Sequence, residues 1–202
     1  MPSEARHHRP VLLDSERLDR YPQAQDLEKL EEAAQASAAA LVSRGRASKD
    51  PSVIKRLVRY TDEFGLEVMA QLWSKASPVS LAGALWRIYA LRALIRSQAQ
   101  QVTIYFRLGL GSSDLDQALA GVPDPPGPQE ICETVDQILA GAYLGDFDVA
   151  LDRFAAFCRV LALGQQQAQA APGAKPQKQT RLLGTAQHLE EAALAWRAGQ
   201  LL

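Results

Sequence analysis

The chain contains few of the residues from which reactive sites are built, with two cysteines and three histidines among its 202 residues. Cys132 and Cys158 are too few for a disulfide scaffold or a cysteine-rich zinc site, and this usage fits a reducing cytoplasm. His7 and His8 lie near the start of the chain and His188 near its end, so no histidine falls in the predicted core, where an acid, a base or a metal ligand would be held. We therefore predict no catalytic residue, no metal and no cofactor, and we expect that the protein is not an enzyme.

The sequence also lacks the pattern of a membrane span or an export signal. Its most apolar run, VSLAGALWRIYALRALI at residues 79–95, is shorter than the roughly 20 residues that cross a bilayer and contains two arginines. The first residues, MPSEARHHRPVLL, carry charges where a signal peptide has its apolar segment. We expect a cytoplasmic protein that makes no contact with a membrane.

Helical periodicity, with its usual starting and stopping residues, dominates what is present. It predicts an all-α bundle of about six to seven core helices plus a detached C-terminal amphipathic helix. Residues 101–108, QVTIYFRL, favour strands, but no second strand is available for pairing, so we extend the preceding helix through them. The core helices are expected at residues 25–44, 51–64, 66–75, 80–109, 113–120, 128–145 and 146–164.

Four segments are expected along the chain. Residues 1–13 are predicted to be a flexible lead, 14–164 a helical core domain, 165–180 a polar, glutamine-rich linker and 181–202 an amphipathic helix. That helix needs an apolar groove, and docking on its own core is favoured over docking on another protein. Its predicted docking face consists of Leu182, Leu183, Ala186, Leu189, Ala193 and Trp196.

Three arginines, Arg87, Arg92 and Arg96, lie in or beside the apolar run. Arg92 falls within the apolar stripe of its helix, and a guanidinium buried there without a partner costs several kcal/mol. An internal ion pair is the favoured interpretation. The alternative is a site for a small anionic ligand formed by these three arginines.

The charge distribution suggests the partner. Residues 44–107 carry 11 basic and 4 acidic side chains, whereas residues 108–152 carry nine acidic side chains and no basic one. We expect the acidic segment to face the basic one, with Asp146, Asp148 and Asp152 as the carboxylates available to Arg92 or Arg96. Arg87 lies on the opposite side of the helix and is expected to face outward at a partner surface.

A second basic cluster suggests a nucleic-acid site. It includes Arg44, Arg46, Lys49, Lys55, Arg56 and Arg59. Two predicted helices meet around Gly65, as in a helix-turn-helix, but the second helix has too little polar face to read bases. We favour a helical interaction or regulatory protein that binds a protein partner or itself, with a DNA-binding regulator as the alternative.

Four segments resemble a family of all-helical proteins from high-GC actinobacteria that has no assigned activity. The resemblance covers residues 10–164 and leaves the C-terminal segment outside. It implies a cytoplasmic helical fold and carries over no catalytic or binding residue. The segments are SRGRASKDPSV (43–53), LWSKASPVSLAGALWRIYALR (72–92), DPPGPQEI (124–131) and GDFDVALDRFAAFCRV (145–160).

Overall fold

The computed structural model describes residues 24–44, 66–115, 119, 124–141, 143–170 and 181–201. Within these ranges the chain forms helices and no strand, which confirms the all-α class. The lead at 1–13, the predicted helix at 51–64 and half of the one at 113–120 lie outside the described residues. The described helices are α2 (Ala24–Arg44), α4 (Leu66–Trp73), α5 (Leu81–Ser97), α6 (Ala99–Leu110), α8 (Pro128–Leu139), α9 (Phe147–Ala170) and α10 (Leu182–Arg197).

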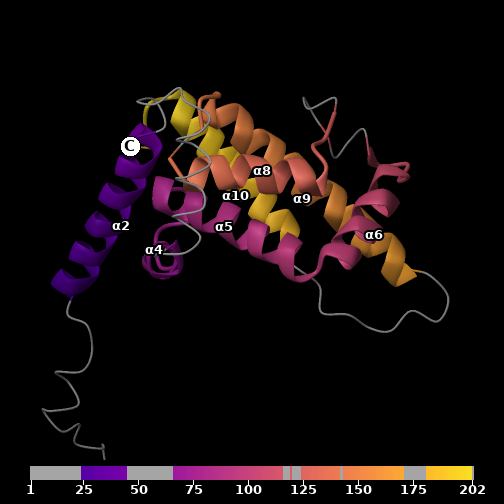
Figure 1. Cartoon of the computed structure of the whole chain (residues 1–202), viewed down its shortest axis with the longest axis horizontal. Coiled ribbons are helices and arrows are strands. Elements are labelled where there is room, and N and C mark those ends of the chain that lie inside the picture. Colours follow the sequence, from indigo (N-terminus) through magenta and orange to yellow (C-terminus); the bar gives the residue numbers. More distant parts are fainter. Residues whose placement is uncertain are drawn as a thin grey trace, which may run out of the picture.

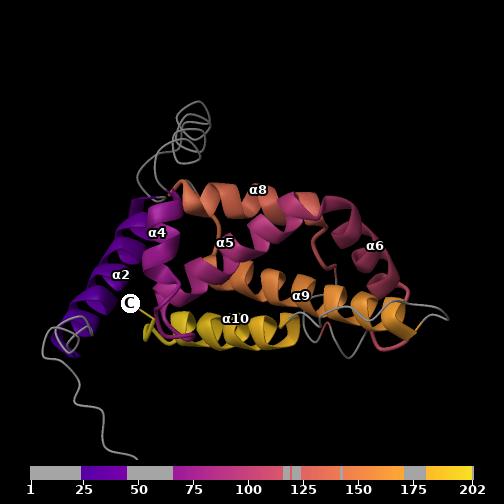
Figure 2. The same ribbon diagram turned by 90° about the horizontal axis from the view of Figure 1, so that it is seen from below.

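Helix α5 is the centre of the bundle (Figures 1 and 2). It contacts α2, α4, α6, α8 and α10. Figure 2 shows α2 and α4 together at one end of the molecule, α6 at the other, and α9 and α10 side by side along one edge. Leu81, Leu85 and Ile88 of α5 are fully buried, so the most apolar run of the sequence forms the core, as its composition predicts.

Two side chains fix the start of α5. The Ser80 hydroxyl accepts a hydrogen bond from the Gly83 backbone N–H, as an N-cap residue does. The Gln35 side chain of α2 accepts one from the Ala82 N–H at 3.3 Å and donates one to the Leu201 carbonyl at 2.7 Å. One glutamine therefore connects α2, the first turn of α5 and the segment after α10.

The single helix predicted over residues 80–109 is interrupted. Residues 101–108 are helical, as expected, but Gln98 leaves the helical conformation with φ −130° and ψ 39° and separates α5 from α6. The change of direction allows α6 to pack on α9, where the rings of Phe106 and Phe157 lie 5.4 Å apart. The segment around Gln98 contains no glycine or proline, so local sequence gave no sign of the break.

The sequence predicts that Gly164 ends α9, but it does not. The helix continues to Ala170, so the predicted linker is helical at residues 165–170, while residues 171–180 lie outside the described part. Gly164 is buried where α6 crosses α9. A Cβ there would overlap the Tyr105 carbonyl oxygen and lie 2.9 Å from the Gly109 nitrogen. Both glycines thus serve the close approach of two helices.

Helix α8 is also shorter than predicted. It ends at Leu139 rather than near Gly145, because Gly141 takes a left-handed conformation with φ 64°. The Gly141 N–H donates to the carbonyl of Ile138. This is the usual C-terminal use of glycine, displaced by four positions from the one predicted.

Helix α10 packs along α9, so the favoured docking on its own core is confirmed. Four of the six predicted docking residues, Leu182, Ala186, Leu189 and Ala193, are buried. Trp196 is half-buried, with its ring 4.9 Å from that of Phe147. Leu183 was wrongly included, because it is 59% exposed.

Candidate functional site

The expected internal ion pair is present in the C-terminal half of α5, with a carboxylate other than the three predicted. Arg92, 8% exposed, donates from Nε to Asp136 Oδ1 of α8. Arg96 donates from Nη2 to Asp136 Oδ2 at 2.9 Å. One carboxylate therefore binds both arginines.

The three predicted carboxylate partners lie elsewhere. Asp148 and Asp152 both accept hydrogen bonds from Arg197 of α10, the former at 2.7 Å from Arg197 Nε. Asp146 is exposed immediately before α9. Asp136 differs from these because it borders the buried stripe of a helix that contacts α5. That position, next to Val135, was the available signal.

Arg87 does not face outward as predicted. Its guanidinium is half-buried, donates from Nη1 to the Gly83 carbonyl at 2.8 Å and lies 3.2 Å from His188 Nδ1 of α10. Burial lowers the pKa of Arg87. No carboxylate among the described residues forms an ion pair with it.

Arg87 lies in the wall of a hollow of about 380 Å³ between α5 and the start of α10. This volume is within the range of small-molecule sites. The lining contains one further cationic side chain, Arg181, the imidazole of His188 and no acidic side chain among the described residues. Its other members are Trp86, Ala90, Leu91, Leu94, Leu182, Gly184 and Thr185.

A second opening, of about 590 Å³, is a groove between α2 and α4. Leu27 and Leu30 of α2 and Val68 of α4 line it and are 52%, 43% and 72% exposed. Glu31 and Lys75 also border the groove. We call the surface formed by Leu27, Leu30, Val68 and their neighbours Ala34 and Leu72 the α2–α4 groove.

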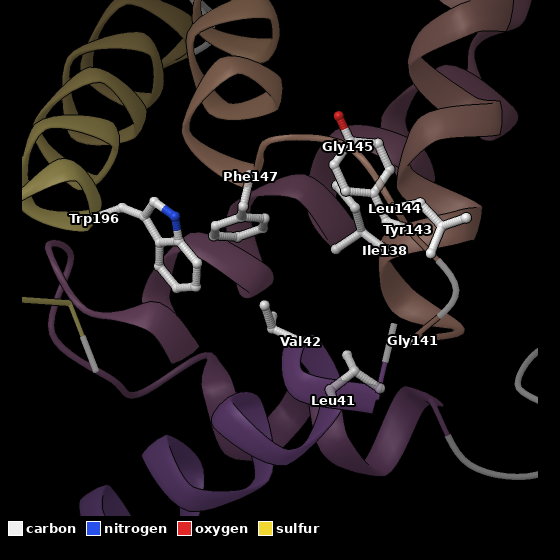
Figure 3. A pocket seen from close by; sticks show the side chains of 9 residues that line it. All are labelled: Leu41, Val42, Ile138, Gly141, Tyr143, Leu144, Gly145, Phe147 and Trp196. Atoms are coloured by element: carbon white, nitrogen blue, oxygen red, sulfur yellow. The ribbon is translucent and has the colours of Figure 1, made fainter. Parts of the chain in front are cut away.

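A third hollow, drawn in Figure 3, lies where α2, α8, α9 and α10 meet. Its volume of about 40 Å³ suits a few water molecules rather than an organic ligand. Leu41, Val42, Phe147 and Trp196 give it apolar walls, and the Tyr143 hydroxyl points away from Leu41 and Val42. We assign it no chemistry.

The remaining predictions concern the basic cluster, a metal site and a membrane span. Of the basic cluster, Arg44 is the last residue of α2, and Arg46, Lys49, Lys55, Arg56 and Arg59 lie outside the described residues, as does Gly65. In the described ranges no group of three histidine, cysteine or acidic residues is placed to hold a metal ion. No helix in those ranges is long and apolar enough to cross a membrane.

The two cysteines are free thiols in different surroundings. Cys158 is fully buried in α9, and burial raises its pKa to about 12. Cys132 is half-buried in α8, and burial, followed by the charge of Asp136, raises its pKa. A thiol acts as a nucleophile through its thiolate, so neither environment activates one.

Comparisons with protein-family models, with curated protein sequences and with solved structures find no match. The resemblance to the actinobacterial helical family therefore stays a prediction. Any function must be inferred from the surfaces described above.

Proposed function

We propose that this protein acts by binding an amphipathic helix of a partner protein in the α2–α4 groove. The observation that carries the proposal is the exposure of three large apolar side chains around one groove, Leu27, Leu30 and Val68. Single exposed leucines are ordinary on protein surfaces, but an apolar groove with a polar border is typical of an interaction site.

The spacing of the apolar residues favours a helix as the bound element. Leu27, Leu30 and Ala34 follow one face of α2, while Val68 and Leu72 follow one face of α4. A groove between two helices accepts a third helix whose anchors recur every three or four residues. Glu31 and Lys75 at the border provide one charge of each sign, which would orient a partner helix that carries charges beside its anchors.

The test places a photo-crosslinking amino acid at position 68 and, as a matched control, at Ile104 of α6, which is 50% exposed and lies outside the groove. We expect one partner to crosslink from position 68 and not from 104. A peptide of the partner's crosslinked segment should then bind the purified protein as a helix. Val68→Asp or Leu30→Asp should weaken the peptide by about tenfold or more, and Ile104→Asp should leave its affinity unchanged.

Two results would overturn this assignment. A purified chain that sediments as a dimer and becomes monomeric on Val68→Asp would assign the groove to a second copy. Protection of an introduced Val68→Cys thiol from alkylation in the monomer, in a Cys132→Ser background, would show that the chain covers its own groove.

A further inference from the structure

In the part of the chain that the structure describes, the interior arginines have carboxylate partners, and Arg87 is the exception. Arg92 pairs with Asp136, and Arg159 pairs with Glu190 through two hydrogen bonds of 2.7 and 2.6 Å. The half-buried Arg87 has a carbonyl and a histidine as hydrogen-bond partners, neither of which neutralises its charge. A buried cation of this kind is stabilised by an anion.

We propose that the hollow between α5 and α10 binds a small organic anion, a carboxylate or phosphate attached to an apolar or aromatic body. Arg87 and Arg181 supply two cationic side chains from different elements. The described lining contains no aspartate or glutamate, so nothing there repels an anion.

His188 adds a hydrogen-bond donor to this site. Arginine only donates, so the contact of Arg87 Nη2 with Nδ1 requires that Nδ1 accepts. The ring proton of the neutral histidine is then on Nε2, where it can donate to a ligand. The start of α10 lies in the same wall, and its first intrahelical bond runs from the Thr185 N–H to the Arg181 carbonyl. The preceding N–H groups have no intrahelical acceptor and add positive potential.

The remaining walls explain why the ligand needs an apolar body. Trp86, whose ring stacks on Tyr89 at 5.8 Å, forms one side together with Leu91 and Leu94. Leu182 closes the opposite side from α10. An inorganic ion would leave most of the 380 Å³ unfilled, whereas an aromatic ring contacts these side chains.

The test is a titration of the full-length ¹⁵N-labelled protein with phenyl phosphate, followed by NMR. We expect saturable shifts of the Trp86 indole and Thr185 amide signals. Benzyl alcohol, which has a similar ring and no charge, should cause no saturable shift. Arg87→Met and Arg181→Met should each weaken binding by about tenfold, because each removes a charge-assisted contact. Arg107→Met, on the exposed surface of α6, is the control and should bind like the wild type.

Three results would overturn the proposal: no saturable shift with phenyl phosphate, equal binding of benzyl alcohol, or an equal loss in Arg107→Met. If Arg87→Met does not fold, the exposed Arg181→Met decides the question. Val68→Asp should retain phenyl phosphate binding, so that failure of this site is distinguishable from failure of the α2–α4 groove.

Discussion

A single carboxylate, that of Asp136, contacts two arginines, and only one of them is deeply buried. The Arg92 side chain is 10% exposed and that of Arg96 47%. A charge in an apolar interior is tolerated only with a partner, whereas a half-exposed charge is largely satisfied by water. The two pairs should therefore differ sharply in their contribution to stability.

We predict that Asp136→Ala destabilises the fold by about 3–5 kcal/mol, because it removes the carboxylate that accepts from Nε of the buried Arg92. Arg96→Met should cost at most about 1 kcal/mol. The double variant Arg92→Met/Asp136→Ala should be more stable than Asp136→Ala alone. Chemical denaturation of all four proteins measures these differences, and a double variant less stable than Asp136→Ala would contradict the ion-pair account.

The cysteines provide a second residue-scale prediction. Cys158 is fully buried and its pKa is raised to about 12, so at pH 8 it is both inaccessible and protonated. Titration with a thiol reagent should therefore label Cys132 alone in the native protein, and both thiols after unfolding. Because burial raises the pKa of Cys132 too, its labelling should still accelerate as the pH rises above the ordinary thiol range. A Cys132→Ser variant that reacts at one thiol while folded would contradict this.

From the sequence, the need of Arg92 for an ion pair was predicted correctly, but the carboxylate that pairs with it was not. The position of Arg92 in an apolar stripe shows, from the sequence of one helix alone, that its charge needs a partner. The choice among nine acidic residues depends on which helix crosses α5 and at which level, and that is a tertiary property. Charge sorting indicated the correct segment, but Asp148 and Asp152 are used by Arg197, which belongs to α10.

At the scale of elements, the crossing of α6 and α9 depends on two glycines. Backbones approach so closely there that Gly109 and Gly164 have no room for a side chain. Gly184, in α10, is the opposite case, because a Cβ there would meet nothing within 4 Å. The same residue type thus has a packing role in one helix and none in another.

Substitution by alanine should therefore have opposite effects at these glycines. Gly164→Ala is expected to destabilise by about 1–3 kcal/mol or more, because the helices must separate. Gly184→Ala should stabilise by about 0.5–1 kcal/mol through helix propensity. Thermal unfolding of the two variants measures this, and a stabilised Gly164→Ala would show that the crossing has more space than described.

Element existence was predictable and element ends were less so. Apolar periodicity predicted the helices because the apolar stripe of a helix depends on the sequence of that segment alone. Glycine was taken as a stop signal at Gly145 and Gly164, yet the stop is at Gly141 and Gly164 is a contact. Glycine permits both uses, and the neighbouring helix decides between them.

At the scale of the whole molecule, α10 completes the core rather than extending from it. Leu189 is fully buried, whereas Leu183 in the same helix is 59% exposed. Leu189→Ala should cost about 2–5 kcal/mol, because it opens a cavity beneath α10. Leu183→Ala should change the unfolding free energy by less than about 0.5 kcal/mol. Equal effects in urea denaturation would mean that α10 is not docked as described.

The position of α10 in the chain has a consequence for synthesis on the ribosome. It is the last of the described helices to be made, yet it covers the apolar face of α9, and Leu201 accepts a hydrogen bond from Gln35 in α2. A nascent chain that has released α9 but not α10 presents that face to the solvent. Such surfaces are the ones that chaperones bind. The final step of folding therefore waits until residues 182–201 have left the exit tunnel.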